Sequence, residues 1–386
     1  MSANGQLVAF SSYATNLVSG DTNGVGDIFI TDRTTGTISR VSVASNGSQA
    51  NGASFDPAFS GDGRYVTFES NATNLVSNDT NNSTDIFVHD RVMGTTTRIS
   101  VASNGNQADG ASFDPAFSAD GRYVAYESAA TNLVSGDTNA ATDVFLYDRV
   151  TGITTRVSVA PSSMQANGGS FDPTLSNDGR FVAFHSDATN LVSGDTNAAT
   201  DIFVFDRTTG TTTRVSIATN GNQADGMSND PVLSTDGRFV TFWSVATTVV
   251  SGDTNGTDDV FLHDRTTGIT TRISVASNGS QANGRSFDPV ISADGAFISF
   301  DSAATNLVSG DTNGAPDIFI HDRVTGVTTR VSIATNGSQA TGASSNHTLN
   351  ADGRYVAFES NATNLVSGDT NGKSDIFVRD RGVPTR

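Results

Sequence analysis

The stretch FDPAFSADGRYVAYES (residues 113–128) decides the fold, together with DVFLYDRVTGITTRVSV (143–159). These residues form four short segments that are apolar or alternate between apolar and polar. Two close connections contain Asp-Gly and Thr-Gly, which are typical of tight turns between antiparallel strands. We therefore expect four strands, at 113–118, 123–128, 143–148 and 154–159. The third, with Val144, Phe145 and Leu146 in a row, should be buried on both faces.

This four-stranded unit recurs with a period of 58 residues, with second strands starting near 7, 65, 123, 181, 239, 297 and 355. A unit of this size cannot bury both faces alone, but copies arranged around an axis can. The repeat therefore predicts an all-β fold, a seven-bladed β-propeller forming a single domain over residues 1–386. First strands and complete fourth strands each occur six times. We expect five complete blades and two three-stranded blades at the seam between the chain ends.

The same residues resemble a known repeat family. The Pro-x-x-Ser-x-Asp-Gly turn, the aromatic-rich second strand and the hydrophobic-Asp-Arg end of the third are similar to the TolB-like, or WD40-like, β-propeller repeat of bacterial envelope and secreted proteins. This resemblance implies the fold over nearly the whole chain. It does not imply one function, because the family includes translocation partners, peptidase-associated propellers and uncharacterised binders.

Composition excludes several functions. The net charge of −18 argues against binding to nucleic acid or to anionic lipid. The absence of cysteine excludes disulfides and zinc–thiolate sites. No apolar run is long enough to insert into a membrane, and no signal peptide precedes the first repeat. Few residues favour helix, so almost no helix is expected. We expect an extracellular, periplasmic or cell-surface protein whose signal peptide has been trimmed.

In each repeat, a loop with the pattern Asp-Thr-Asn-x-x-x-Asp follows the second strand. Side-chain oxygens at its positions 1, 3 and 7 can converge on a hard cation, and calcium accepts such irregular oxygen sets. The alternative is a turn in which Asp and Asn bond to their own backbone. The predicted calcium ligands are Asp21, Asn23 and Asp27; Asp79, Asn81 and Asp85; Asp137, Asn139 and Asp143; Asp195, Asn197 and Asp201; Asp253, Asn255 and Asp259; Asp311, Asn313 and Asp317; and Asp369, Asn371 and Asp375.

Strand alternation places the two long loops of each repeat on one face and the two tight turns on the other. Long loops on a rigid scaffold usually carry binding, so we expect function on the loop-rich face. The aspartate of each Asp-Pro pair should lie there, at the mouth of the central channel, either to attract cations or basic peptides or to cap its own turn. These aspartates are Asp56, Asp114, Asp172, Asp230 and Asp288. The Asp-Arg pairs, Asp32-Arg33 through Asp380-Arg381, are expected to form structural hydrogen bonds.

The residue near the end of the second strand differs between blades. Glu127, His185 and the single tryptophan, Trp243, occupy this position in three of them, and we treat these as candidate ligand-binding residues. Neutral drift at a tolerant position is the alternative interpretation.

We expect a calcium-stabilised, non-catalytic module that recognises a protein or glycan on the loop-rich face. No HExxH, Gly-x-Ser-x-Gly or phosphate-binding glycine loop is present. One alternative is a structural protein that self-associates through its open seam. Another is a hydrolase or lyase that uses the channel carboxylates.

Overall fold

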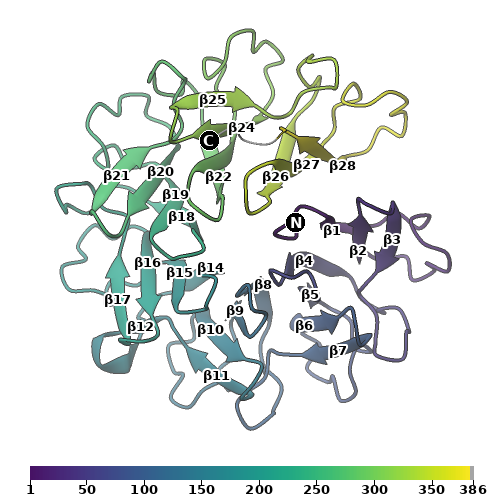
Figure 1. Ribbon diagram of the computed structural model, residues 1–386. Helices are drawn as coiled ribbons and strands as arrows, with labels where there is room; N and C mark the ends of the chain where they lie inside the picture. Colours follow the sequence, from purple (N-terminus) through teal and green to yellow (C-terminus); the bar gives the residue numbers. More distant parts are fainter. Residues whose placement is uncertain (383–386) are drawn as a thin grey trace. The chain divides into compact units, whose positions relative to one another are not determined.

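The computed structural model describes residues 1–382, and the predicted seven-bladed β-propeller is confirmed (Figure 1). Each blade is an antiparallel sheet whose strands pair in chain order. The blades, numbered in chain order, are β1 (Leu7–Ser12), β2 (Asp27–Asp32) and β3 (Thr37–Arg40); β4 (Ser54–Phe59), β5 (Tyr65–Ser70), β6 (Asp85–Asp90) and β7 (Thr95–Arg98); β8 (Ser112–Phe117), β9 (Tyr123–Ser128), β10 (Asp143–Asp148) and β11 (Ile153–Arg156); β14 (Ser170–Leu175), β15 (Phe181–Ser186), β16 (Asp201–Asp206) and β17 (Thr211–Arg214); β18 (Ser228–Leu233), β19 (Phe239–Ser244), β20 (Asp259–Asp264) and β21 (Ile269–Arg272); β22 (Ser286–Ile291), β23 (Phe297–Ser302), β24 (Asp317–Asp322) and β25 (Val327–Arg330); and β26 (Ser344–Leu349), β27 (Tyr355–Ser360) and β28 (Asp375–Asp380).

The first and last blades have three strands each, as predicted. In blade 3, β9 and β10 have the predicted bounds, whereas β11 is shorter than the predicted 154–159 and ends at Arg156. The reason is Ser158, whose hydroxyl donates to the carboxylate of Asp143 and accepts the N–H of Val144. Val157 still donates its backbone N–H to the carbonyl of Val144 at 2.9 Å, and beyond it the Ser158 side chain replaces the regular strand ladder.

Helix is nearly absent from residues 1–382, as the composition predicted. A single 3₁₀ turn, Pro161–Ser163, connects the short strands β12 (Val159–Ala160) and β13 (Met164–Gln165). No helix among these residues has the length and apolar character needed to cross a membrane.

The core consists of apolar layers between neighbouring blades. In β10, Val144 and Leu146 pack into one cluster with Phe184 of blade 4. Phe145, between them in sequence, points the other way and packs against Tyr126 and Ile86. All three β10 side chains are buried, which confirms that this strand is covered on both faces. Each such side chain contributes about 1.5–3 kcal/mol on burial.

The two kinds of connection lie on opposite sides, as predicted. In blade 2, Arg64 of the Asp-Gly turn forms a two-point ion pair with Asp90 at the end of β6, at 3.1 and 2.7 Å. Arg91 donates to the carbonyl of Gly63 in the same turn. These contacts agree with the structural role expected for the Asp-Arg pairs. On the other side the two long loops meet, where Asn74 donates to the carbonyl of Gln49.

The chain divides into two compact units, residues 1–196 with 203–213, and residues 197–202 with 214–386. The prediction of a single domain over 1–386 stays a prediction. The contacts that build the candidate sites below each lie within one unit.

Candidate binding site

In the first six repeats, the Asp-Thr-Asn-x-x-x-Asp loops bring their predicted ligands together around an arginine. In blade 1 the guanidinium Nη1 of Arg40 lies 3.2 Å from a carboxylate oxygen of Asp21 and 3.2 Å from one of Asp27. Asn23 donates its amide to Asp27 and to the carbonyl of Ala50. Ser42 donates to the second Asp27 oxygen. A protein side chain thus supplies the positive charge that the sequence assigned to calcium.

We call this arrangement the arginine lock: one arginine from the fourth strand between the two loop aspartates of its own repeat. The same two ion pairs recur at 3.0–3.3 Å in four further blades, and in blade 4 Arg214 pairs with Asp201 at 3.1 Å. The lock arginines are Arg40, Arg98, Arg156, Arg214, Arg272 and Arg330. A calcium ion in these loops would have to displace a guanidinium; calcium binding there stays a prediction.

Sequence reasoning missed the lock arginines. They lie 13 residues beyond the last loop aspartate and were read as ordinary strand residues. One signal was available: the first six repeats all carry this arginine at the same spacing from the loop aspartates.

The five aspartates of the Asp-Pro pairs lie on the first strand of their blades and have an unusual backbone. Their φ angles are +47 to +51°, although a residue before proline normally avoids helical conformations. Pairing with the second strand shifts register here, as between Phe55 and Ala58 in blade 2. Such strained residues cost of order 1–3 kcal/mol and cluster at functional sites.

In the first unit, glutamates from the second strands join these aspartates. Glu69 accepts the backbone N–H of Asp114 at 3.2 Å, and Glu127 accepts that of Asp172 at 3.0 Å. Each glutamate therefore supports the strained aspartate of the next blade. Sequence reasoning proposed Glu127 as a ligand-binding residue but not Glu69, which is its exact counterpart 58 residues earlier.

The result is a continuous row of five carboxyl groups, which we call the carboxylate row: Asp56, Glu69, Asp114, Glu127 and Asp172. Asp56, Glu69 and Asp114 offer oxygens within 4.8 Å of one another, and so do Asp114, Glu127 and Asp172. Acidic triads of this geometry could hold a metal ion. Among residues 1–382, no arginine or lysine forms an ion pair with Asp56, Glu69 or Glu127.

The row is electrostatically unfavourable. Burial, followed by the charge of Asp56, raises the pKa of Glu69 to about 7. Burial, followed by the charge of Asp114, raises the pKa of Glu127 to about 7. Burial also raises the pKa of Asp56. Near neutral pH the row therefore holds bound protons that a cationic ligand would displace.

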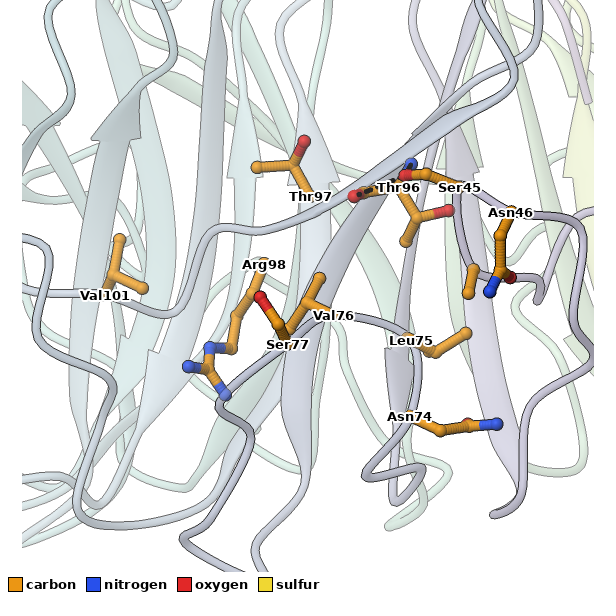
Figure 2. Close-up of a pocket in the computed structure, with 11 residues that line it drawn as sticks. Ser45, Asn46, Asn74, Leu75, Val76, Ser77, Thr96, Thr97, Arg98 and Val101 are labelled. Atoms are coloured by element: carbon orange, nitrogen blue, oxygen red, sulfur yellow. Dashed lines mark hydrogen bonds between the residues drawn. The ribbon is translucent and has the colours of Figure 1, made fainter.

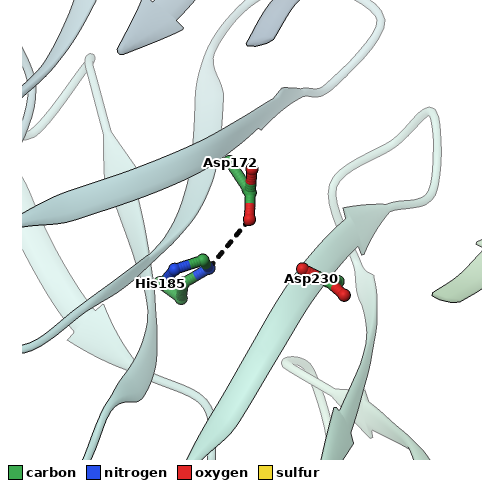
Figure 3. Close-up of side chains that lie close together, drawn as sticks. All are labelled: Asp172, His185 and Asp230. Atoms are coloured by element: carbon green, nitrogen blue, oxygen red, sulfur yellow. Dashed lines mark ion pairs between the residues drawn. The ribbon is translucent and has the colours of Figure 1, made fainter. Parts of the chain in front are cut away.

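The other two candidate residues also contact the Asp-Pro aspartates. The Nδ1 atom of His185 lies 3.3 Å from a carboxylate oxygen of Asp172 (Figure 3). In the second unit, the indole N–H of Trp243 donates to Asp230. The residue near the end of the second strand thus contacts the aspartate of the Asp-Pro pair both where it is histidine and where it is tryptophan.

Further along the second unit, burial and the charges of Asp301 and Asp230 raise the pKa of Asp288. Asp301 itself bonds to Nδ1 of His347 at 2.7 Å, and both side chains are fully buried. This histidine occupies the position that is proline in the five preceding repeats, a difference that is visible in the sequence.

A polar groove also opens between adjacent blades on the loop-rich side (Figure 2). It measures about 650 Å³, and its residues include Ser45, whose hydroxyl accepts the N–H of Thr96 at 2.9 Å. An equivalent groove of about 710 Å³ lies one repeat later, around Ser103 and Thr154. Because its position and lining repeat with the blades, we regard this groove as a product of blade packing.

Comparisons with known proteins establish the fold. No family model and no curated protein sequence matches the chain. Similar solved structures include oligogalacturonate lyase in complex with manganese, with a TM-score of 0.60, 12% identity and coverage of 98% of this chain and 87% of the lyase. The β-propeller domain of the Trilobed protease from Pyrococcus furiosus has a TM-score of 0.59, 12% identity and coverage of 98% and 91%.

TolB from Acinetobacter baumannii is also similar, with a TM-score of 0.47 and 16% identity; the match covers 85% of this chain and 63% of TolB. The chain thus spans less than two thirds of that TolB chain. The five four-stranded and two three-stranded blades of the described residues confirm the predicted seven-bladed β-propeller fold. Since the similar structures include a lyase and peptidases as well as TolB, they do not establish a function.

Proposed function

We propose that the protein is a non-catalytic binding module whose carboxylate row binds a positively charged segment of a partner protein. The observation that carries this proposal is that three carboxyl groups of the row have no basic partner among residues 1–382. The loop aspartates have an arginine of their own, whereas Asp56, Glu69 and Glu127 have no arginine or lysine ion pair within residues 1–382. A lysine or arginine from a partner would supply that charge and lower the raised pKa values.

A protein ligand fits better than a neutral glycan, because a glycan offers no positive charge to the row. The strained aspartate backbones favour binding as well, since they fix the carboxylates in place before a ligand arrives. The net charge of −18 would draw a basic partner toward the module from a distance.

A divalent cation is the second candidate ligand, and the geometry of the two acidic triads favours it. The calcium that the sequence predicted in the loops would meet less competition in this row, because Asp56, Glu69 and Glu127 form no ion pair with an arginine or lysine of residues 1–382. An extracellular or periplasmic location would suit such a site, because calcium is plentiful outside cells and the chain has no cysteine to oxidise.

The enzyme alternative has less support from the side chains. Of the two His–Asp pairs described above, His347 with Asp301 is fully buried, out of reach of a substrate, and only His185 with Asp172 is partly exposed. A lyase that used these carboxylates on an anionic substrate would need a metal to bridge the two; the similar oligogalacturonate lyase is described in complex with manganese.

The test is a calorimetric titration with a tetra-arginine peptide at low salt, where charge interactions are least screened. Asp114→Asn removes the carboxylate shared by both triads and should weaken binding by at least about tenfold. Asp109→Asn is the matched control, because the equivalent residues of other repeats, Asn51 and Asn167, make the same loop contacts as Asp109.

The two candidate ligands give different results. If a metal is the ligand, calcium or manganese should raise the melting temperature of the wild-type chain and not that of Asp114→Asn. If both variants weaken peptide binding equally, the peptide senses net charge alone and the proposed site is wrong.

A further inference from the structure

A small pocket lies between blades 3 and 4 on the side of the tight turns. It measures about 180 Å³, and its lining includes Tyr123, Leu146, Asp148, Ile153 and Arg207. Leu146 and Asp148 belong to β10, Ile153 begins β11, and Arg207 follows β16 of the next blade. All five residues belong to the first compact unit. The pocket thus combines an apolar wall from one blade with a guanidinium group from the next.

The guanidinium group of Arg207 has no acidic partner. Its Nη1 donates to the carbonyl of Gly179 at 2.7 Å, and its Cζ lies 4.0 Å from the centroid of the Tyr123 ring. It forms no ion pair within residues 1–382. Asp148 already accepts two hydrogen bonds from Arg122, at 3.0 and 2.7 Å, which lower the pKa of its carboxyl group to about 2. Two arginines and one aspartate therefore leave one positive charge at the pocket.

Apolar surface is open to solvent beside this charge. Ile153 is 49% exposed, although the pattern of the repeat allows a polar residue here. Blades 2 and 4 have threonine at the equivalent position, Thr95 and Thr211. Leu146, in contrast, is buried. An exposed isoleucine next to an arginine without a counter-ion offers apolar contact and one anion-binding group at the same place.

The same arrangement recurs in the second unit, between blades 5 and 6. The counterparts of the five lining residues are Phe239, Leu262, Asp264, Ile269 and Arg323. Only the tyrosine is changed. The Cζ of Arg323 lies 4.3 Å from the centroid of the Phe239 ring, its Nη1 donates to the carbonyl of Gly295 at 2.6 Å, and Ile269 is 47% exposed. Burial lowers the pKa of Arg323, as expected for a guanidinium group whose charge is incompletely compensated.

We propose that each of these two sites binds a small carboxylic acid with a short apolar chain. The carboxylate would bind the arginine, Arg207 or Arg323, and the chain would contact the isoleucine, Ile153 or Ile269. Arg207 makes one hydrogen bond to a protein carbonyl from its side chain, so further N–H groups remain for a carboxylate.

The size of the pocket limits the ligand to a short chain. Its volume of about 180 Å³ is below the range of about 300–1,000 Å³ that is typical of sites for drug-sized ligands. A free acid of a few carbon atoms therefore fits better than a larger molecule. This inference does not depend on the carboxylate row, whose proposed ligand has the opposite charge.

The test uses hexanoate and the full chain with isotope-labelled isoleucine methyl groups, observed by NMR. The salt concentration is about 0.15 M, where the net charge of −18 is screened beyond about 8 Å. We expect the methyl signals of Ile153 and Ile269 to shift in a saturable manner at millimolar hexanoate, and not with hexylamine. Arg207→Gln should weaken the response at Ile153 at least about tenfold and leave that at Ile269 unchanged, and Arg323→Gln should do the reverse. Each site is thus the control for the other, and the retained response shows that the variant folds.

Four outcomes would overturn the proposal, and three of them need only the wild-type chain. The first is the absence of a saturable shift at either methyl signal. The second is an equal response to hexanoate and to hexanol, which would show that apolar contact alone drives binding. The third is a response to the peptide Gly-Gly-Ile at lower concentration than to hexanoate, which would make a protein C-terminus the occupant. The fourth is an unchanged response at both isoleucines in both arginine variants, which would show that the arginines do not bind the acid.

Discussion

Replacing Arg330 by alanine tests the arginine lock. Its side chain is 10% exposed, and it contacts Asp311 and Asp317, which are 4% and 0% exposed, at 3.2 Å each. It also donates to Gln339 at 2.9 Å. The substitution leaves two buried carboxylates without a counter-ion. Removing one partner of a buried ion pair costs about 3–5 kcal/mol, so we expect a loss of that size in the free energy of unfolding.

The same variant separates arginine from calcium as the source of positive charge. Without the guanidinium, Asp311, Asn313 and Asp317 form the open oxygen set that the sequence predicted for calcium. Calcium at a hundred times its dissociation constant would restore about 2.7 kcal/mol. Urea unfolding with 1 mM calcium or with chelator should therefore show a calcium effect that is larger in Arg330→Ala than in the wild-type chain.

Arg238→Ala is the control for a generic loss of charge. Arg238 pairs with Asp264 at 2.7 Å, but its side chain is 43% exposed, so solvent screens the pair and the expected loss is much smaller than for Arg330→Ala. A loss below 1 kcal/mol in Arg330→Ala would show that the lock does not stabilise the blade. An equal calcium effect in the wild-type chain and in Arg330→Ala would show that calcium binds away from this loop.

Three further changes have defined outcomes. Burial raises the pKa of Glu127 from 4.5 to about 7, so the folded chain binds its proton more tightly than the unfolded chain, and stability falls as pH rises through that window. Glu127→Gln should therefore match the wild-type chain at pH 4 and exceed it by about 2–3 kcal/mol at pH 8 in urea unfolding. Ser332→Ala removes a bond to a buried carboxylate and one to a strand N–H, and should cost about 2–4 kcal/mol. Gly121→Ala would place its Cβ 2.9 Å from the Tyr65 ring at a φ of +67°, whereas Gly136→Ala, at +78° with nothing within 4 Å, would add strain alone; melting temperatures should fall further for Gly121→Ala.

Each of these expectations can be contradicted directly. A pH-independent difference for Glu127→Gln would mean that its carboxyl group does not titrate near neutral pH. A cost below 1 kcal/mol for Ser332→Ala would mean that water satisfies the exposed groups. Equal melting temperatures for the two glycine variants would show that the Tyr65 ring moves aside without cost.

The fold could be predicted in detail because the repeat supplies the same information several times. The alternating pattern around Val124 and the apolar run at Phe145 gave the bounds of β9 and β10 as the structure has them. The strand count at the two ends gave the three-stranded blades. Both inferences rest on local sequence patterns, which short strands and tight turns follow closely.

The sites were less predictable because they depend on side chains that meet across the fold. Asp21 and Asn23 suggested a cation loop, but the cation is Arg40, which comes from another strand. A proline after Asp114 predicts extended backbone, and the positive φ there results from a register shift that no local pattern shows. The meeting of Glu69 with Asp114 likewise depends on how one blade packs against the next.

The arginine lock has a consequence for how such proteins evolve. All of its atoms, from Asp21 to Ser42 in the first copy, come from a single 58-residue repeat. A gene segment encoding one repeat can therefore be duplicated or deleted by unequal recombination, and no buried charge in the neighbouring repeat then loses its ion-pair partner. Blade number can change in one genetic event, while any trait built across blades, such as the pairing of Glu69 with Asp114, must be reassembled after each such event.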